Sequence, residues 1–453
     1  MSSSFLISPS PPTGNNRRIK LPGLDLLIMT RIDNVFVYPS EINIDQFKEA
    51  LSRTLSLWPL VAGRILLEND QHYIIEMCDN SIPIIFVVNN DLKEWPLDSN
   101  VVVDLNEKQL PTFIDEVQVT KFFNNSSDEP FVRFKLTHIV QSGEWVLGIS
   151  WYHPLGDAAS CLHFSNTLSR FYQQMEPTKP LPIFERRLWR EDEADESVLP
   201  MMKHLRDAKP AEEVLKTFLD HQLNYDQVNL HFSGDQLATL RKLAGGDSVT
   251  IQDALTAYII LTLNTYCYNN NDERRILRTN TVINFRGVSD SIASQGQVAN
   301  AVFSMLSNNF DDPYSLSNIA KTIRQSIIQL RDSKFLEAAL ATLDGLMRKC
   351  IKNNKLPDLR LVPNEFVVNS NFRHDWASLV DFGYTDKCRL YTAWTGASYL
   401  RVFRLNPEKD GNKWLPRDRD GAEVAFRVEK DLKEKFINAC KRDINENFKN
   451  VKQ

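Results

Sequence analysis

The chain has 453 residues, of which 42% are hydrophobic and 25% are charged, and its net charge is −5. This is the composition of a globular protein with enough apolar residues for two cores, so we expect two domains. The small negative charge gives no electrostatic reason to expect a nucleic-acid or membrane partner.

The 16 glycines exclude two common kinds of site. No two of them lie two residues apart, as a dinucleotide-binding G-x-G-x-x-G requires, and none lie four apart, as a G-x-S-x-G nucleophile elbow requires. Gly143 and Gly148 have the spacing of a P-loop, but Ile149 stands where that loop needs lysine. The chain therefore carries neither a nucleotide-phosphate loop nor the usual serine-hydrolase nucleophile.

The six cysteines are scattered, with no C-x-x-C pair, and residues 1–20 contain no apolar stretch typical of a secretory signal. No segment is apolar enough to span a membrane. We therefore expect a cytoplasmic protein. A monomer is a separate expectation.

The N-terminal part predicts helices over 42–56 and 158–175 and strands over 63–67, 72–77, 83–88, 131–137 and 145–152. A linker rich in proline and charge follows at 176–200. The C-terminal part predicts strands over 228–232, 279–285, 361–370, 391–394, 399–405 and 423–428 and helices over 235–244, 251–263, 315–332, 335–352 and 431–445. This mixture lacks strict βαβ alternation and indicates an α/β fold with mixed sheets.

The stretch VLGISWYHPLGDAAS, residues 146–160, is the most informative for chemistry. A predicted strand delivers His153 to a tight turn that contains Gly156, and Asp157 then opens a helix. A histidine on a turn too short to wander suits a general base, and the aspartate can cap the helix or hold the turn. The competing interpretation is a core histidine followed by a capping aspartate.

A second segment has the same spacing. HFSGD at residues 231–235 also lies between a predicted strand and a predicted helix, with Ser233 and Asp235 as natural helix caps. The spacing between His231 and Asp235 equals that in the first segment, so spacing alone does not choose between the two histidines.

The third candidate is DFGYT at residues 381–385. Asp-Phe-Gly occurs in the magnesium site of protein kinases, but the glycine-rich loop and the His-Arg-Asp loop of those enzymes are missing here. The competing interpretation is a loop in which Gly383 allows a turn and Asp381 pairs with an arginine.

In chain order these motifs resemble those of the BAHD family of CoA-dependent acyltransferases, which carry H-x-x-x-D in mid-chain and D-F-G-W-G later. Other family-like segments are SPSPPT at 8–13, LPGLD at 21–25, WPLVAGR at 58–64, HFS at 231–233 and QGQVANA at 295–301. The HFS match implies a structural strand around His231 and so points to His153 as the functional histidine. Tyr384 and Thr385 depart from the tryptophan and glycine of the family motif.

The resemblance implies two similar chloramphenicol-acetyltransferase-like domains around an interdomain tunnel, with domains at 1–175 and 226–453 and a crossover linker at 176–225. It implies transfer of an acyl group other than an amino-acyl group from acyl-CoA, as co-substrate, to a hydroxyl or amine of a small, specialised metabolite. No covalent acyl-enzyme, metal or permanently bound cofactor is expected. The implied residues are His153 as base, Asp157 and Asp381 as further catalytic candidates, Ser370, Tyr384 and Asn34 for CoA or substrate, and Arg286, Gly156 and Gly383 for support.

Two other functions stay open at this point. A carrier-protein-dependent condensation domain shares the H-x-x-x-D logic, although the segment 381–385 and the N-terminal signature favour the BAHD family. A non-catalytic BAHD-like binding protein would also fit the altered Tyr384, but retention of His153 and Asp157 speaks against it. For Ser370, a strand-end hydroxyl with a local hydrogen bond is the competing interpretation.

Overall fold

The computed structural model describes residues 2–27, 30–69, 72–99, 101–104, 108–123, 128–202, 205, 207–210, 212–214, 216, 223–268, 272–357, 364–393, 396–411, 413–449 and 451. The predicted strands at 361–370 and 391–394 each extend beyond these residues at one end. Within these ranges, no helix has both the length and the apolar character needed to cross a membrane.

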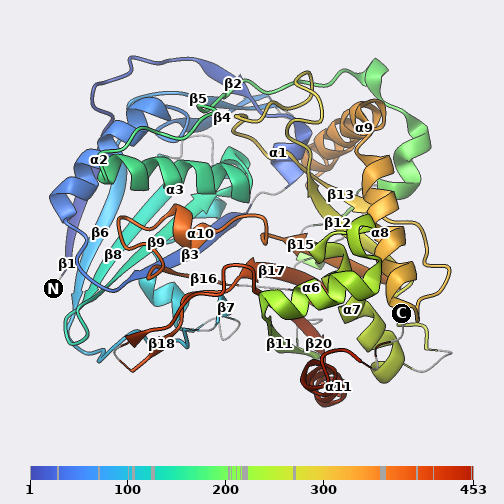
Figure 1. Ribbon diagram of the computed structural model, residues 1–453. Helices are drawn as coiled ribbons and strands as arrows, with labels where there is room; N and C mark the ends of the chain where they lie inside the picture. Colours follow the sequence, from blue (N-terminus) through green and yellow to red (C-terminus); the bar gives the residue numbers. More distant parts are fainter. Residues whose placement is uncertain are drawn as a thin grey trace.

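Two large sheets organise the chain (Figure 1). The first has the strand order β1-β6-β8-β9-β3-β16-β7 and the second has the order β11-β20-β17-β15-β12-β13. The first comprises β1 (Ser2–Ile7), β3 (Arg31–Tyr38), β6 (Ile82–Asn89), β7 (Val103–Asp104), β8 (Val132–Ile139), β9 (Glu144–Tyr152) and β16 (Arg389–Ala393). The second comprises β11 (Tyr225–Phe232), β12 (Arg278–Asn284), β13 (Val302–Leu306), β15 (Glu365–Ser370), β17 (Tyr399–Arg404) and β20 (Ala422–Glu429).

Helices cover both sheets, and three small sheets complete the structure. The helices are α1 (Gly23–Leu27), α2 (Ile44–Leu57), α3 (Ala158–Tyr172), α6 (Gly234–Ala244), α7 (Ile251–Thr262), α8 (Leu316–Leu330), α9 (Ser333–Lys352), α10 (Trp376–Leu379) and α11 (Lys433–Asn445). The small sheets pair β2 (Arg18–Lys20) with β5 (His72–Glu76) and β4 (Arg64–Asn69), β10 (Lys209–Pro210) with β14 (Lys355–Leu356), and β18 (Lys409–Asp410) with β19 (Lys413–Trp414).

Helices α2 and α3 lie over the same face of the first sheet (Figure 1). The side chain of Asn43 accepts a hydrogen bond from the Gln46 N–H and so caps the start of α2. Phe47 of α2 and Phe164 of α3 then pack with Phe134 of the sheet in one apolar core. Burial of these large rings supplies the main driving force for this layer.

Strand β9 runs through the middle of the first sheet, antiparallel to β8 on one side and to β3 on the other. All nine of its residues are buried, and the predicted hairpin with the preceding strand is confirmed. Because both of its edges are paired, β9 is rigid at its end, Tyr152, where the His153 turn begins.

The second sheet mixes parallel and antiparallel pairs in the same way. Strand β12 runs parallel to β15 and antiparallel to β13. Helices α6, α7 and α8 pack against one face of the sheet in a second core, and α9 packs with β12 and β13 in a third. Helix α7 begins at a capping box in which Thr250 and Asp253 bond to each other's backbone N–H.

The two halves of the chain are interwoven. Strand β16 comes late in the sequence, yet it joins the first sheet between β3 and β7. The loop that precedes β16 also lies against the first core, where the Phe382 ring packs against those of Tyr38, Phe47 and Tyr172. The boundaries at 175 and 225 stay predictions, and this later segment completes the N-terminal core.

Candidate active site

The His153 turn is held by backbone bonds on both sides. The His153 N–H donates to the Thr30 carbonyl at 2.9 Å, and the Gly156 N–H donates to the His153 carbonyl at 2.9 Å. A Cβ atom at Gly156 would lie 2.5 Å from Ser160 Oγ. Only glycine therefore lets the turn pack this closely against the first turn of α3.

Asp157 is the N-cap of α3 and also one half of a buried ion pair. Its Oδ1 accepts the Ser160 N–H at 3.1 Å, which satisfies a free donor at the helix start. Arg286, just after β12, reaches the carboxylate with two nitrogens, Nη1 to Oδ2 at 2.7 Å and Nη2 to Oδ1 at 3.1 Å. The Ala301 N–H adds a fourth bond, to Oδ2 at 3.0 Å. The structure thus brings Asp157 and the predicted Arg286 together.

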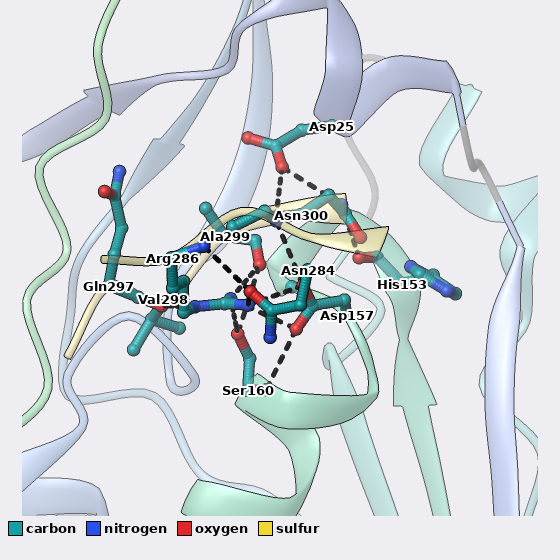
Figure 2. A network of polar contacts seen from close by, with 12 residues as sticks. Asp25, His153, Asp157, Ser160, Asn284, Arg286, Gln297, Val298, Ala299 and Asn300 are labelled. Atoms are coloured by element: carbon teal, nitrogen blue, oxygen red, sulfur yellow. Dashed lines mark hydrogen bonds and ion pairs between the residues drawn. The ribbon is translucent and has the colours of Figure 1, made fainter. Parts of the chain in front are cut away.

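Arg286 bonds to residues of several segments around Asp157 (Figure 2). Its Nη2 donates to Ser160 Oγ at 2.9 Å and to the Ala299 carbonyl at 2.7 Å, and its Nε donates to the Gln297 carbonyl at 2.8 Å. Every arm of the guanidinium is used, so a residue of the second half holds the histidine turn of the first half.

The electrostatics favour a neutral histidine. Burial lowers the pKa of His153 below its ordinary value, and the nearby Asp157 carboxylate opposes this only in part. Burial raises the pKa of Asp157, but the Arg286 guanidinium outweighs it and leaves the pKa below its usual range. The His153 ring points away from Asp157 (Figure 2), so the aspartate acts on the turn and not as a direct partner of the ring.

Three further buried residues surround the turn, and none of them is among the residues predicted from the sequence. Asp25 Oδ1 accepts the backbone N–H of Asn300 at 2.8 Å and its side-chain amide at 3.0 Å, and Arg186 Nη1 lies 3.1 Å from Asp25 Oδ2. Arg186 Nη2 donates to the Leu155 carbonyl at 2.7 Å. Asp25 and Asn300 lie inside two of the family-like segments, a usable signal, whereas nothing in the sequence marked Arg186.

Ser370 lies at the end of β15, in a different place. It donates to Gln252 Oε1 at 2.6 Å and accepts the Phe372 N–H at 3.2 Å, so the predicted local hydrogen bond is present. It also lines an open groove of about 530 Å³ at the start of α7. The other lining residues are Arg241, Thr250, Ile251, Gln252, Phe372 and Arg373. Two guanidinium groups beside a helix N-terminus suit a phosphate-bearing ligand.

The Asp381 loop packs against the first core. Asp381 Oδ1 accepts bonds from the Gln173 amide at 3.1 Å and the Gly383 N–H at 2.9 Å, and Oδ2 accepts the Thr385 hydroxyl at 3.0 Å. Gly383 has a φ of +96°, which explains the glycine. Tyr384 donates to the Glu41 carbonyl.

Among the residues that the structure describes, the side chains of Asp381 and Tyr384 bond within their own loop and to Gln173 and Glu41, and not to His153, so these predicted residues lie outside the hydrogen bonds of the histidine site. Asn34 is buried in β3 opposite Ile149 of β9, on the sheet face that also carries Phe36 and Tyr38. Across the part of the chain that the structure describes, no cluster of three or more His, Cys, Asp or Glu side chains could hold a metal ion.

Comparison with known proteins supplies a family and a fold. A model of the Transferase family matches residues 1–392. A search of curated proteins finds no match.

Among solved structures, vinorine synthase is 17% identical with a TM-score of 0.63, and the match covers 96% of each chain. TRI101 of F. graminearum, complexed with coenzyme A and T-2 mycotoxin, is 14% identical with a TM-score of 0.60 over 95% of this chain and 98% of that chain. TRI101 of F. sporotrichioides, complexed with coenzyme A and T-2, is 14% identical with a TM-score of 0.58 over 93% and 97%. These likenesses confirm the predicted mixed α/β fold class with two chloramphenicol-acetyltransferase-like domains.

Proposed function

The chain belongs to the Transferase family, the BAHD acyltransferases that transfer acyl groups from acyl-CoA to small metabolites, and we propose that His153 is its general base. The observation that carries the proposal is the buried turn itself, which presents a histidine of lowered pKa at the end of the rigid strand β9. A neutral imidazole at working pH is what proton abstraction requires.

The reaction follows from this geometry. The imidazole takes the proton of the acceptor hydroxyl or amine while the acceptor oxygen or nitrogen forms a bond to the thioester carbonyl carbon. The tetrahedral intermediate then breaks its carbon–sulfur bond, and the CoA thiolate leaves with the proton that His153 had taken. The products are the ester or amide and free CoA, with no covalent acyl-enzyme. A positioned base of this kind contributes about 10²- to 10⁴-fold to the rate.

Asp157 serves as a positioning residue in this scheme. Its two oxygens accept bonds from Arg286, the Ser160 N–H and the Ala301 N–H, which leaves it committed to the turn. Burial lowers the pKa of His153, and the Asp157 carboxylate is the strongest influence that raises it. The charge of Asp157 therefore still favours the imidazolium that forms in the reaction. Asp157 thus holds the base in place and stabilises its protonated form.

The groove at Ser370 is the proposed entry for acyl-CoA. Arg241 and Arg373 line it, and Arg373 can pair with phosphate oxygens, whereas Arg241 already pairs with Asp247 and donates to the Val249 carbonyl. Ser370 and Gln252 can bond to the amide-rich pantetheine arm. Two solved structures of F. graminearum TRI101 are complexed with coenzyme A, which supports CoA as the ligand class. We propose that the pantetheine arm runs from this groove through an interdomain tunnel to His153.

The other predicted residues take supporting places in this proposal. Asn34 would face the acceptor side of the tunnel, while Asp381 and Tyr384 would shape the wall that faces CoA. The acyl group would be other than an amino-acyl group, and the acceptor a specialised metabolite. We also propose a cytoplasmic monomer without a permanently bound cofactor or a nucleic-acid partner.

The test is thiol release from a panel of acyl-CoAs incubated with hydroxylated and amine-bearing acceptors. We expect acceptor-dependent release of free CoA together with an ester or amide product. Consumption of an acyl-carrier-protein substrate, with every acyl-CoA left intact, would replace the proposal by a condensation function. A protein whose melting temperature no acyl-CoA raises at saturation would instead be a non-catalytic relative.

A further inference from the structure

The segment that links β15 to α10 crosses from the second sheet to the first (Figure 1). At its start, Phe372 and Arg373 line the groove at the start of α7 together with Ser370. At its end, Trp376 belongs to the first core. His374 therefore lies between the proposed CoA groove and the first half of the chain.

Hydrogen bonds and an ion pair hold the backbone on both sides of His374. The His374 N–H donates to the Asn371 carbonyl at 2.8 Å, and the Asn371 N–H donates to the Val402 carbonyl of β17 at 2.8 Å. The next residue, Asp375, accepts two bonds from Arg417, Nη2 to Oδ1 at 2.8 Å and Nη1 to Oδ2 at 2.9 Å. Because both neighbours are fixed, the His374 ring has a defined place from which it can contact a bound molecule.

His374 also lies on the side of the groove that faces the Asp157–Arg286 ion pair. Strands β12 and β15 pair in parallel, so their carboxyl ends lie at the same edge of the second sheet. Arg286 follows β12 by two residues and His374 follows β15 by four, which places both at that edge. The charges agree with this placement, because the Asp157 carboxylate raises the pKa of His374 and the Arg286 guanidinium lowers it.

The His374 ring is half-buried, neutral and free to bond. Burial is the main cause that lowers its pKa below the ordinary value, and the charge of Arg373 adds to this. Among the residues that the structure describes, none forms a hydrogen bond with either ring nitrogen. A neutral imidazole has one donor and one acceptor nitrogen, and leaving both unpaired away from water is costly unless another molecule meets them.

We propose that His374 is a specificity-determining residue for the acyl donor, whose imidazole hydrogen-bonds to the amide groups of the pantetheine arm of CoA. The inference deepens the proposed function and rests on acyl-CoA being the donor. An amide offers one N–H and one carbonyl, which match the acceptor and the donor nitrogens of a neutral ring. The pantetheine arm would meet Ser370 and Gln252 first and His374 next, on its way from the groove toward the His153 turn.

The test is a pair of calorimetric titrations of the full-length protein, which need no turnover. One ligand is CoA, and the other is adenosine 3′,5′-bisphosphate, which has the nucleotide end of CoA but no pantetheine arm. We expect His374→Ala to weaken CoA binding about 3- to 10-fold, through the loss of one or two hydrogen bonds, and to leave the Kd of the bisphosphate unchanged. His374→Asn keeps one donor and one acceptor and should recover part of the affinity for CoA.

The matched control is His231→Ala. His231 is another half-buried histidine of the second sheet, but its ring already pairs with Glu423. This variant should bind both ligands with wild-type affinity. In steady-state assays His374→Ala should raise the KM for acyl-CoA by the same factor as the Kd, while kcat and the KM for the acceptor stay near their wild-type values.

Three results would overturn the proposal: wild-type affinity of His374→Ala for CoA, an equal loss of affinity for CoA and for the bisphosphate, or a raised KM for the acceptor alone. The last result would assign the ring to the acceptor. A wild-type protein that binds no CoA would refute the proposed function together with this inference. A protein that binds CoA but transfers no acyl group would refute the proposed function alone, so the two failures are distinguishable.

Discussion

Two segments of this chain share the pattern His-x-x-Gly-Asp, and their side chains have different partners in the structure. HPLGD at 153–157 follows β9, and HFSGD at 231–235 leaves β11. The first connects the central strand β9 to helix α3, and the second connects the edge strand β11 to helix α6. The two segments therefore have nearly the same local sequence and the same local structure.

The two segments differ in the residues from distant parts of the sequence that contact them. In the first segment Asp157 caps α3 and is paired with Arg286. In the second, Ser233 caps α6 and Asp235 is exposed, while His231 Nε2 lies 3.1 Å from Glu423 Oε2.

Glu423 is fully buried and accepts the backbone N–H groups of Val102 and Val103 at 2.8 Å each. His231 thus supports a contact between the two sheets. The comparison teaches that a five-residue pattern gains its chemistry from distant partners.

The largest expected contrast comes from removing each histidine. His153→Ala should lower kcat/KM about 10²- to 10⁴-fold, because the reaction loses its base. His231→Ala should leave kcat/KM within about twofold, since that ring only pairs with Glu423. Thiol release under identical conditions measures both. Equal losses in the two variants would mean that the first histidine has no special role.

The two aspartates should differ in stability. Asp157→Ala leaves a buried guanidinium without its carboxylate and should lower the free energy of unfolding by about 3–5 kcal/mol. Asp235→Ala removes an exposed side chain from a helix that Ser233 already caps, so a change within about 0.5 kcal/mol is expected. Urea denaturation followed by circular dichroism gives both values. A loss for Asp157→Ala no larger than that for Asp235→Ala would show that the ion pair does not hold the turn.

The two glycines sharpen the comparison at the backbone. A Cβ at position 156 would lie 2.6 Å from Ser160 Cβ, inside the first turn of α3, so Gly156→Ala should cost about 1–3 kcal/mol and part of the activity. Gly234→Ala brings its Cβ within 2.8 Å of Asp420 Cβ, on an exposed loop that can move, and should cost less than about 1 kcal/mol. Melting curves and kcat/KM of both variants test this, and the reverse order of losses would contradict it.

The smallest expected effect is in the pH profile. The pKa of His153 is lowered by burial, so the base stays neutral as the pH falls through the ordinary histidine value of about 6.5. The acidic limb of kcat/KM should therefore begin below that pH, with activity lost as the falling pH protonates the ring. His231→Ala should show the same limb. A limb centred at or above about 6.5 would contradict the buried, neutral base.

Local signals predicted much of the secondary structure. The helix predicted over 42–56 is α2 (Ile44–Leu57), because its apolar periodicity and Pro59 act within one segment. The strands β1 and β3 were missed. β3, with the sequence RIDNVFVY, begins with charged residues and ends in an apolar run, so it shows no alternation. Its pairing with β9 and β16 on either side makes it a central strand, and both partners are distant in the sequence.

The residues of the candidate site also fall into those that the sequence predicted and those that it did not. The sequence predicted His153, Asp157, Gly156 and Arg286, which the structure joins in one turn and its ion pair. It assigned no role to Asn300, Asp25 or Arg186, although these surround the same turn. Their roles depend on hydrogen bonds between residues 31 to 275 positions apart, which spacing along the chain does not reveal.

The sequence by itself determined what local physics controls: the amphipathic helices, the glycine turns, the caps and the order of the motifs. Only the tertiary structure decided which of two equal His-x-x-Gly-Asp patterns is buried beside Arg286 and Asn300 and which one supports Glu423. The physical reason is that pKa and hydrogen-bond satisfaction depend on burial and on neighbours in space, and Arg286 and Glu423 are both distant in the sequence from the histidine segments that they contact.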